Sequence, residues 1–474
     1  MSEKQWGNTA YVLGEEGRKV MKEEKKKSYE MDMCNGPLLG KILAFYFPLM
    51  LSGVLQLLFN AADIVVVGRF AGSESLAAVG STSSLINLLV NVFMGLSVGA
   101  NVLIARYYGA GQKRDLNEMV HTAIATSLIS GVFLIALGIV ASKPLLHLMG
   151  TPDDVIDYSV LYIRIYFVGM PAMMAYNFGA AILRAIGDTK RPLYYLLFAG
   201  VVNVVLNLFF VIGFGMGVAG VAIATDVSQV ISAALVLRCL MKSEGDYQLH
   251  IRELRIVPRK LLRMIQIGVP AGIQGALFSI SNMLIQSSIN SFGSVAMAGS
   301  TAAGNIEGFV YTSMNAFQQA AVSFTGQNYG AGKYKRIRKI LLICMAAVTV
   351  VGLILGNAAY FFGDIVLRIY SSDAEVIQYG VQRLAKIAAP YFLCGLMEVL
   401  VGVIRGMGYA IMPMLVSLVG VCLLRVVWIY SVFQTHRSLS VLYLSYPVTW
   451  IVTILLHLIC FMVVYRKKSR MRSV

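Results

Sequence analysis

The sequence has 474 residues, of which 57% are hydrophobic and only 14% are charged, and its formal net charge is +16. Soluble globular proteins average about 45–50% apolar and about 25% charged residues, so the composition excludes a soluble protein of this size. The positive charge does not indicate a nucleic-acid partner, because most lysines and arginines lie in the two termini and in alternate loops. The composition therefore predicts an all-α polytopic membrane protein embedded in a lipid bilayer.

Twelve apolar segments are long enough to cross a bilayer, which takes about 20 helical residues. The first six are predicted at 41–67, 85–105, 119–142, 160–183, 193–213 and 218–241. The other six are predicted at 261–290, 304–326, 340–362, 380–404, 412–434 and 442–465. We expect every segment to be helical, because backbone polar groups in lipid must be hydrogen-bonded within their own segment.

The basic residues predict the orientation of these segments. They gather in both termini, in the loops after spans two, four and eight, and in the linker between spans six and seven. Loops of the other parity hold only Arg69, Lys143, Arg368 and Arg437. Because loops rich in Lys and Arg stay on the cytoplasmic side, both termini are predicted to be cytoplasmic.

The second half of the sequence repeats the first half. The motif YGAG at 108–111 recurs at 329–332, an offset of 221 residues. At the same offset, Arg184, Gly187 and Pro192 match Arg405, Gly408 and Pro413. An even number of spans per repeat gives both halves the same orientation, with a cleft between them that suits alternating access.

The repeat predicts two homologous six-helix lobes around a central cleft. The predicted parts are a cytoplasmic N-terminal tail (1–40), an N-lobe (41–241), a cytoplasmic linker (242–258), a C-lobe (259–465) and a basic cytoplasmic tail (466–474).

Asp63 is an acid within the first apolar segment. An ionised carboxylate there is costly unless a cation, a proton or polar neighbours stabilise it. Two interpretations stay open. The carboxylate lies near a helix end and is bound by the backbone or by Arg69, or it belongs to a coupling-ion site.

Several motifs together resemble one family, the multidrug and toxic compound extrusion (MATE) transporters. They are VVGRFAG at 66–72, the two YGAG loops, LRAIGDTKRP at 183–192 and GFGMGVAGVAIAT at 213–225. The resemblance covers about residues 31 to 465 and points to the bacterial branch. It implies a monomeric exporter of the bacterial inner membrane, not an enzyme, in which inward Na+ or H+ movement drives export of drug-like, often cationic, compounds. No ATP-binding motif GxxxxGK[ST] and no other cofactor motif is present in the sequence.

The resemblance also implies a cation site in the first half. In the bacterial branch, an Asp in span one, an Asn and an Asp in span five and a Thr in span six enclose a sodium ion. Asp63, Asn203 and Thr225 match this set, whereas Asn207 stands where that branch has its second Asp. The oxygens of these four side chains suit a hard cation, although one carboxylate binds Na+ more weakly than two. For Asn203 and Asn207, hydrogen bonding between helices is the alternative role.

Four further residues are candidates for the substrate cavity or for a second ionisable site. Asn177 and Glu398 occupy equivalent positions of the repeat, and Arg425 is a base within span eleven. Glu398 and Arg425 either form a structural ion pair or take part in substrate or proton binding. Glu307, near the outer end of span eight, is either an interfacial acid or a functional one. Arg184, in the loop after span four, is expected to brace helix ends.

The leading hypothesis is a secondary active antiporter that exports small organic compounds. A lipid-linked oligosaccharide flippase of the same superfamily is the alternative, although the intramembrane acids at least match the single mid-span arginine, Arg425. A membrane-embedded enzyme would need a cluster of His, Asp or Glu at an interface, and a channel would need a filter-like loop. The sequence shows neither.

Overall fold

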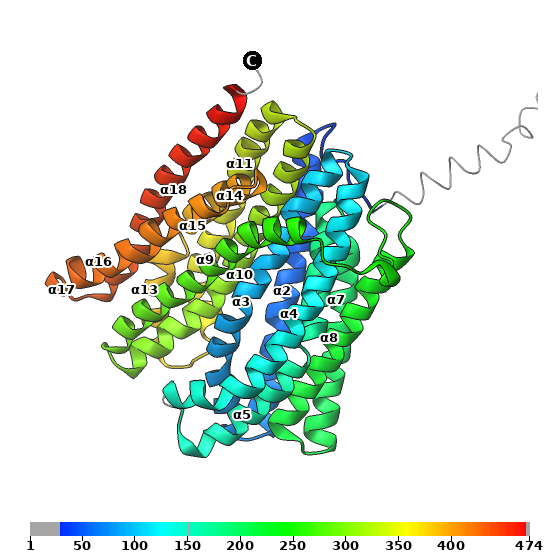
Figure 1. Ribbon diagram of the computed structural model, residues 1–474. Helices are drawn as coiled ribbons and strands as arrows, with labels where there is room; N and C mark the ends of the chain where they lie inside the picture. The colour runs from blue at the N-terminus through cyan, green and yellow to red at the C-terminus, as the bar shows by residue number, and fades with distance from the viewer. Residues whose placement is uncertain (1–28, 150, 471–474) are drawn as a thin grey trace, which may run out of the picture.

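The computed structural model describes residues 29–149 and 151–470, and all regular structure in them is helical (Figure 1). The helices of the first half are α2 (Leu38–Phe70), α3 (Ser73–Gly109), α4 (Lys113–Leu148), α5 (Asp153–Val168), α6 (Met170–Ala185), α7 (Lys190–Leu208), the π-helix η1 (Phe209–Gly213) and α8 (Gly217–Lys242). A short 3-10 helix, η2 (Ile251–Glu253), lies in the segment that leads to the second half.

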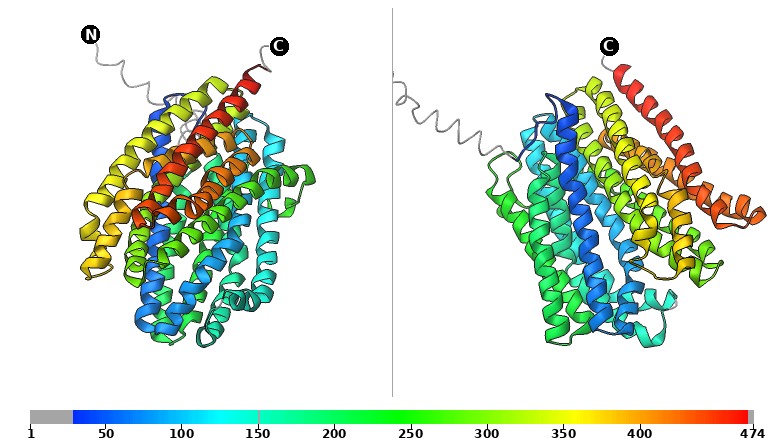
Figure 2. Two further views of the ribbon diagram at one scale, coloured as in Figure 1. Left: turned by 90° about the vertical axis from the view of Figure 1, so that its left-hand side faces the viewer. Right: turned by 180° about the vertical axis from the view of Figure 1, so that it is seen from behind.

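The second half repeats this order. Its helices are α9 (Pro258–Asn290), α10 (Ser294–Gly330), α11 (Tyr334–Phe361), α12 (Gly363–Leu367), α13 (Ala374–Ile387), α14 (Phe392–Gly406), α15 (Ile411–Ser417), the π-helix η3 (Leu418–Leu423), α16 (Leu424–Tyr430), α17 (Val432–Thr435) and α18 (Leu439–Arg470). Figures 1 and 2 show the two halves as two groups of helices side by side, one blue to green and the other green-yellow to red.

The fold of twelve spans in two six-helix lobes, predicted from the sequence, is confirmed. Among the described residues, nine helices have the length and hydropathy of a membrane span, and two bent pairs, α5 with α6 and α13 with α14, raise the number to eleven. The twelfth span is α10, whose 37 residues are long enough but include many polar side chains. Those side chains are largely buried, because α2, α3, α11, α13 and α14 surround the helix.

Two breaks in the helices were not predicted. Span four bends by 48° between α5 and α6, and span ten bends by 47° between α13 and α14. Pro171 follows the first break and Pro390 lies in the second. Because proline lacks a backbone N–H and clashes with the preceding turn, it interrupts a helix where the neighbouring packing permits. The breaks divide two predicted spans into two helices each.

The two lobes pack closely at the end of the bundle where α2 begins and α18 ends, which we call the terminal end. There α3 of the N-lobe lies against α9 of the C-lobe at glycines, and a Cβ atom on Gly99 would lie 2.5 Å from the backbone oxygen of Met264. Ser323 donates a hydrogen bond to Asn101 across the lobes (3.2 Å). The lobes therefore meet tightly at the terminal end.

A short segment before α2, residues 29–37, crosses the terminal end, and we call it the strap. Its Glu30 accepts hydrogen bonds from the hydroxyls of Tyr108 (2.9 Å) and Tyr247 (2.7 Å), on the N-lobe side. The carbonyl of its Met33 accepts a hydrogen bond from Asn328 of α10 (3.0 Å). The strap therefore links both lobes. The rest of the predicted N-terminal tail, residues 1–28, lies outside the described residues, and the limits of tails, lobes and linker stay predictions.

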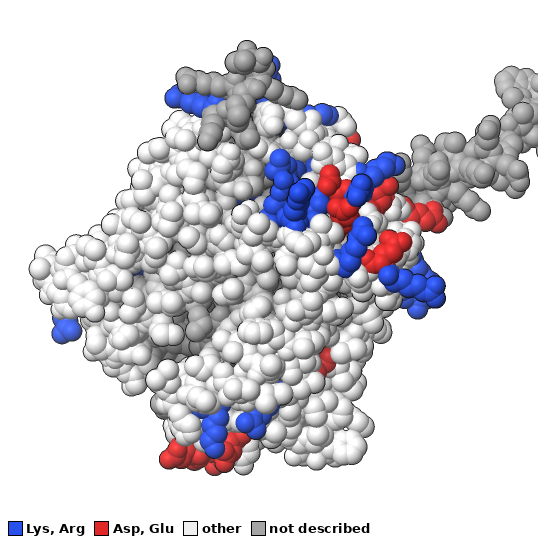
Figure 3. All heavy atoms as spheres, viewed as in Figure 1, with Lys and Arg blue, Asp and Glu red and all other residues white. Residues whose placement is uncertain are grey.

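The outer surface of the helix bundle is largely apolar, as expected for a protein that spans a membrane. On the face that it draws, Figure 3 shows a wide belt with very few charged side chains between the charged groups near the two ends of the bundle. Large apolar side chains are exposed along this belt, for example Phe198 on α7, Leu342 on α11 and Leu455 on α18. Side chains of this kind face lipid in a membrane protein, so the surface supports a multi-pass protein.

Candidate functional site

The four predicted coupling residues lie together inside the N-lobe. Asp63 comes from α2, Asn203 and Asn207 from one face of α7, and Thr225 from α8. The amide of Asn207 donates hydrogen bonds to the Asp63 carboxylate and to Asn203 Oδ1, the latter at 3.3 Å. Asn203 in turn donates to Thr225 Oγ1 at 3.4 Å. Three helices thus place one carboxylate, two amides and a hydroxyl in one chain of contacts.

Close helix packing makes this arrangement possible. Gly200 lies one turn before Asn203 on α7, and a side chain there would overlap the ring of Phe59 on α2. Phe59 in turn lies one turn before Asp63. The missing side chain at Gly200 lets α2 and α7 approach, so that Asp63 and Asn207 meet.

The donor set fits a hard cation. The side-chain oxygen of Asn207 is fully buried and has no hydrogen-bond partner among the described residues. A buried acceptor without a donor is unfavourable, and a cation beside the Asp63 carboxylate would satisfy it. No group of three or more His, Cys, Asp or Glu residues occurs in the described part of the chain, so a transition-metal centre is not indicated there.

In the described structure Asp63 is hydrogen-bonded to Asn207 and not paired with Arg69, so the part of that alternative that involves Arg69 is not supported. The electrostatic neighbours of the site are Tyr162 and Tyr166 of α5, which interact with both Asp63 and Asp226. Asp226 itself accepts a hydrogen bond from the backbone of Gly169, at the break between α5 and α6. Asp226 is therefore a second acid of this lobe, held at a helix break rather than in the amide chain.

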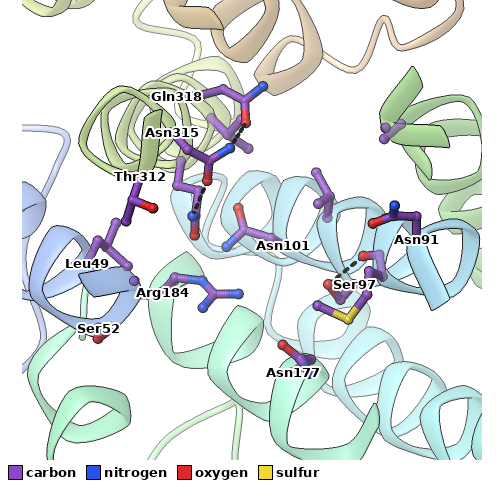
Figure 4. Close-up of a pocket in the computed structure, with 18 of the residues that line it drawn as sticks. Leu49, Ser52, Asn91, Ser97, Asn101, Asn177, Arg184, Thr312, Asn315 and Gln318 are labelled. Carbon is purple, nitrogen blue, oxygen red and sulfur yellow. Dashed lines mark hydrogen bonds between the residues drawn. The ribbon is translucent and has the colours of Figure 1, made fainter. Parts of the chain in front are cut away.

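A cavity of about 510 Å³ lies between the two lobes. It is lined from the N-lobe by Asn177 and Arg184 of α6, and from the C-lobe by Gln318 of α10 and by Glu398 and Arg405 of α14. Figure 4 shows Arg184 and Asn177 on one side of this cavity and Gln318 on another. We call it the central cavity. Asn177 and Glu398, as well as Arg184 and Arg405, are equivalent positions of the repeat, so the cavity follows the internal symmetry of the chain.

The sequence analysis placed Arg184 in the loop after span four, whereas the structure places it in a helix. Arg184 lies in the last turn of α6 and its side chain lines the central cavity. The helix continues to Ala185, which carries the guanidinium onto the cavity wall.

Of the two roles left open for Glu398 and Arg425, the structural ion pair is not found in the described structure. Glu398 accepts a hydrogen bond from the amide of Gln318 and interacts electrostatically with Arg405 on the same helix. No ion pair joins Glu398 to Arg425 within the described residues. The two side chains lie on successive spans, but they project into different surroundings, and sequence spacing does not reveal the rotation of one helix relative to the next.

Glu307 is not an interfacial acid. Its two carboxylate oxygens each accept a hydrogen bond of 2.9 Å from Arg383 of α13, in a buried bidentate ion pair. Arg383 also donates to Ser300 at 2.7 Å. The sequence analysis missed Arg383, because it lies on the buried face of an amphipathic helix whose other face is polar.

A second cavity, of about 450 Å³, lies in the C-lobe, and we call it the C-lobe cavity. Glu307, Arg383 and Arg425 line it, and it shares Glu398 and Tyr311 with the central cavity. The two cavities are therefore neighbours, and all four second-site candidates, Asn177, Glu398, Arg425 and Glu307, line one or both of them.

The sequence matches a family model and several known transporters. The MatE family model matches residues 48–209 and again residues 270–431. The chain is 29% identical over 440 residues to the probable multidrug resistance protein YoeA of Bacillus subtilis, covering 91% of this chain and 95% of that protein. It is 23% identical over 334 residues to a FAD transporter of Shewanella oneidensis, covering 69% of this chain and 74% of that protein.

The fold agrees with these relatives. A crystal structure of MATE in complex with MaL6 superposes with a TM-score of 0.86 at 21% identity, over 92% of this chain and 98% of that one. The two matches of the family model fall on the two lobes, each starts at a proline of the first helix of its lobe, and together they cover more than half of the chain. The chain therefore belongs to the MatE family, the multidrug and toxic compound extrusion transporters.

Proposed function

We propose that this transporter is a secondary active antiporter, which exports drug-like organic compounds while Na+ or H+ moves inward through the N-lobe. Membership of the family makes the chain a membrane transporter rather than an enzyme. The observation that carries the coupling proposal is the buried chain of Asp63, Asn207, Asn203 and Thr225, with the unpartnered oxygen of Asn207 beside the only carboxylate of the four.

The site is placed to influence the central cavity. Asp63 lies on the side of α2 that faces α7, whereas Asn60, three residues earlier, lines the central cavity. One helix therefore connects the ion site with the substrate space. Coupling requires that the ion bind one lobe arrangement more tightly than the other, and a cation that draws α2, α7 and α8 together meets this requirement.

The membrane potential is one source of the free energy that export against a gradient requires. A membrane potential contributes about 2.3 kcal/mol per elementary charge per 100 mV. A cation that enters through the N-lobe can thus offset the export of an organic compound against its gradient.

The decisive experiment uses inverted membrane vesicles with separately imposed Na+ and H+ gradients. We expect wild type to accumulate a fluorescent drug with at least one of the two gradients. Asp63→Asn keeps the shape of the side chain and removes its charge, so we expect normal folding but no gradient-driven uptake. Asp364→Asn is a matched control, because it makes the same change at an exposed acid outside the ion site and outside both cavities. Full gradient-driven uptake by Asp63→Asn would contradict the assignment of the coupling residue.

We further propose that the protein is a monomer in the inner membrane of a bacterium, with the terminal end in the cytoplasm. The basic residues of alternate loops support this orientation. In a variant without native cysteines, Ser438→Cys before α18 should react with an impermeant maleimide added outside, and Lys242→Cys at the end of α8 should not. Labelling of Lys242→Cys from outside would reverse the orientation.

The nature of the substrate is open to a second candidate. Cationic drugs are the substrates that the resemblance implies. One relative, however, is a FAD transporter, and FAD carries two phosphate groups. Export of lipid-linked oligosaccharides, which are also phosphorylated, is the alternative activity, and the arginines of the two cavities favour it more than the sequence suggested.

A further inference from the structure

The two cavities contain more arginines than carboxylates. Arg184 and Arg405 line the central cavity, and Arg383 and Arg425 line the C-lobe cavity. The carboxylates are Glu398, which lines both cavities, and Glu307, which is already paired with Arg383. Among the described lining residues, four guanidinium groups thus face two carboxylates. The sequence-based expectation that the acids match a single arginine is therefore wrong for the cavities.

Arg425 is a buried cation without an anionic partner in the described structure. Its guanidinium donates hydrogen bonds only to neutral oxygens, those of Thr449 (3.3 Å), Asn282 (3.2 Å) and Ser281 (3.5 Å). Its Cζ atom lies 4.1 Å from the centre of the Tyr446 ring. These contacts hold the side chain in place, but they leave its positive charge uncompensated while it faces the cavity.

Arg405, which lines the central cavity, also forms no ion pair in the described structure. Its Nη2 donates to Gln274 Oε1 at 2.8 Å, whereas its buried Nε has no hydrogen-bond partner in the described structure. Glu398 interacts with it electrostatically but does not form an ion pair with it. Arg184, across the central cavity, has no carboxylate among its electrostatic neighbours.

Buried arginines without an ion-pair partner are unfavourable in a membrane protein. A charged side chain within the bilayer is unfavourable unless an opposite charge compensates it, and such residues usually mark a pathway for a substrate or an ion. Glu307 and Arg383 show that this lobe compensates charge where no ligand is needed. The missing carboxylate at Arg425, and the lack of an ion pair between Arg405 and Glu398, are therefore best explained by a negative charge that the substrate brings.

We propose that the two neighbouring cavities bind organic compounds that carry a carboxylate or phosphate group, with Arg425 and Arg405 as the counter-charges. This proposal rests on the exporter function and names its substrate class. The two arginines contact α9 at Ser281 and Gln274, seven residues apart, which corresponds to about 10 Å along the helix. A guanidinium group can bind either anion with two parallel hydrogen bonds.

The aromatic walls suit the organic part of such a compound. Tyr391, Trp450 and Phe278 line the C-lobe cavity, and Phe278 also lines the central cavity. An anionic head at Arg425 or Arg405 would thus leave an aromatic or aliphatic body against these rings.

The test compares two xanthene dyes of similar size and opposite charge, 6-carboxyfluorescein and rhodamine 6G. Their binding to the purified protein in phosphatidylcholine nanodiscs is measured by fluorescence polarisation. We expect wild type to bind carboxyfluorescein more tightly than rhodamine 6G. Arg425→Gln and Arg405→Gln should each weaken carboxyfluorescein binding about tenfold or more, as expected for a lost charge-assisted hydrogen bond. Neither change should weaken the binding of rhodamine 6G.

Two controls separate binding from structure. Arg425→Lys keeps the charge and should retain most of the affinity, whereas Arg368→Gln removes an exposed arginine outside the cavities and should change nothing. A melting temperature of Arg425→Gln at or above that of wild type is expected, because the change removes an uncompensated buried charge. A much lower melting temperature would assign Arg425 a structural role and overturn its part in the proposal.

The outcomes also distinguish this proposal from the proposed function. Tighter binding of rhodamine 6G than of carboxyfluorescein, or unchanged carboxyfluorescein binding in both glutamine variants, would overturn the anionic substrate class even if vesicles export rhodamine 6G. Charge-dependent binding of carboxyfluorescein without any gradient-driven transport would support the substrate class and contradict the antiporter.

Discussion

The two lobes are repeats of one another, yet at equivalent positions the N-lobe has an acid and an amide where the C-lobe has an isoleucine and a buried arginine. At the repeat offset of 222 that relates Pro48 to Pro270, the position of Asp63 is taken in the C-lobe by Ile285, which is buried. The position of Asn203 is taken by Arg425 at the same offset. In the loop before these residues the offset is 221, as for Pro192 and Pro413. The π-helix η3 lies between Pro413 and Arg425, and a π-helical turn inserts one residue into a helix, which raises the offset to 222.

The difference indicates a division of labour. The N-lobe places a carboxylate among amides and a hydroxyl, and in the proposed function a cation or proton from outside balances its charge. The C-lobe places a guanidinium among hydroxyls and an amide at the corresponding helices α9, α16 and α18, so it carries a fixed positive charge of its own. One ancestral six-helix unit could thus give an ion site in one lobe and an anion-binding surface in the other.

The largest expected effect concerns the buried pair that sets the C-lobe apart. Arg383→Met leaves the Glu307 carboxylate buried without its partner, and we expect a loss of about 3–5 kcal/mol of unfolding free energy. Glu307→Gln with Arg383→Met should recover most of the loss, because no charge is then left unpaired. The measurement is thermal unfolding of the detergent-solubilised variants.

A matched cycle on Glu398 and Arg425 provides the contrast. Glu398→Gln and Arg425→Met should add within about 0.5 kcal/mol, because these residues form no ion pair. Strong non-additivity there, together with additive losses at Glu307 and Arg383, would reverse our assignment of charge partners in the C-lobe.

The second prediction sharpens the N-lobe side of the comparison. Asn207→Asp puts a second carboxylate beside Asp63, and two like charges in one buried site require a cation more strongly than one does. We expect the Na+ concentration for half-maximal transport to fall by about tenfold, a change of about 1.4 kcal/mol in binding free energy. Asn177→Asp adds the same charge in the central cavity and should leave this concentration unchanged. An unaltered Na+ requirement of Asn207→Asp would remove Na+ as the coupling ion of this site.

The sequence was sufficient for the fold, and the family resemblance predicted that the four N-lobe side chains lie together, whereas their role in binding a coupling ion stays a prediction. The apolar spans follow from composition, and the four-residue spacing of Asn203 and Asn207 places both on one helix face. The charge partners of the C-lobe could not be predicted, because they depend on the rotation of each helix about its axis. Arg383 was hidden among the polar residues of an amphipathic helix, and Arg184 was assigned to a loop that begins two residues later.

The smallest expected effect concerns the contact between the lobes rather than either site. Glu30 of the strap accepts hydrogen bonds from Tyr108 and Tyr247, and Asn328 of the C-lobe holds the same segment three residues later. Glu30→Gln replaces charged hydrogen bonds with neutral ones at a partly exposed site. We expect a loss of about 1 kcal/mol in the closure of the terminal end, which is about a fivefold shift between lobe arrangements.

Spin labels at Gln112 and Lys335, one exposed residue on each lobe near the terminal end, report this shift as a longer mean distance. Tyr108→Phe removes one of the two hydrogen bonds to Glu30 from the other side and should lengthen the distance in the same direction. Glu375→Gln changes an exposed acid outside the strap and serves as the control. If the distance distribution of Glu30→Gln equals that of wild type, the strap does not hold the lobes together, and the tight packing of α3 against α9 alone closes the terminal end.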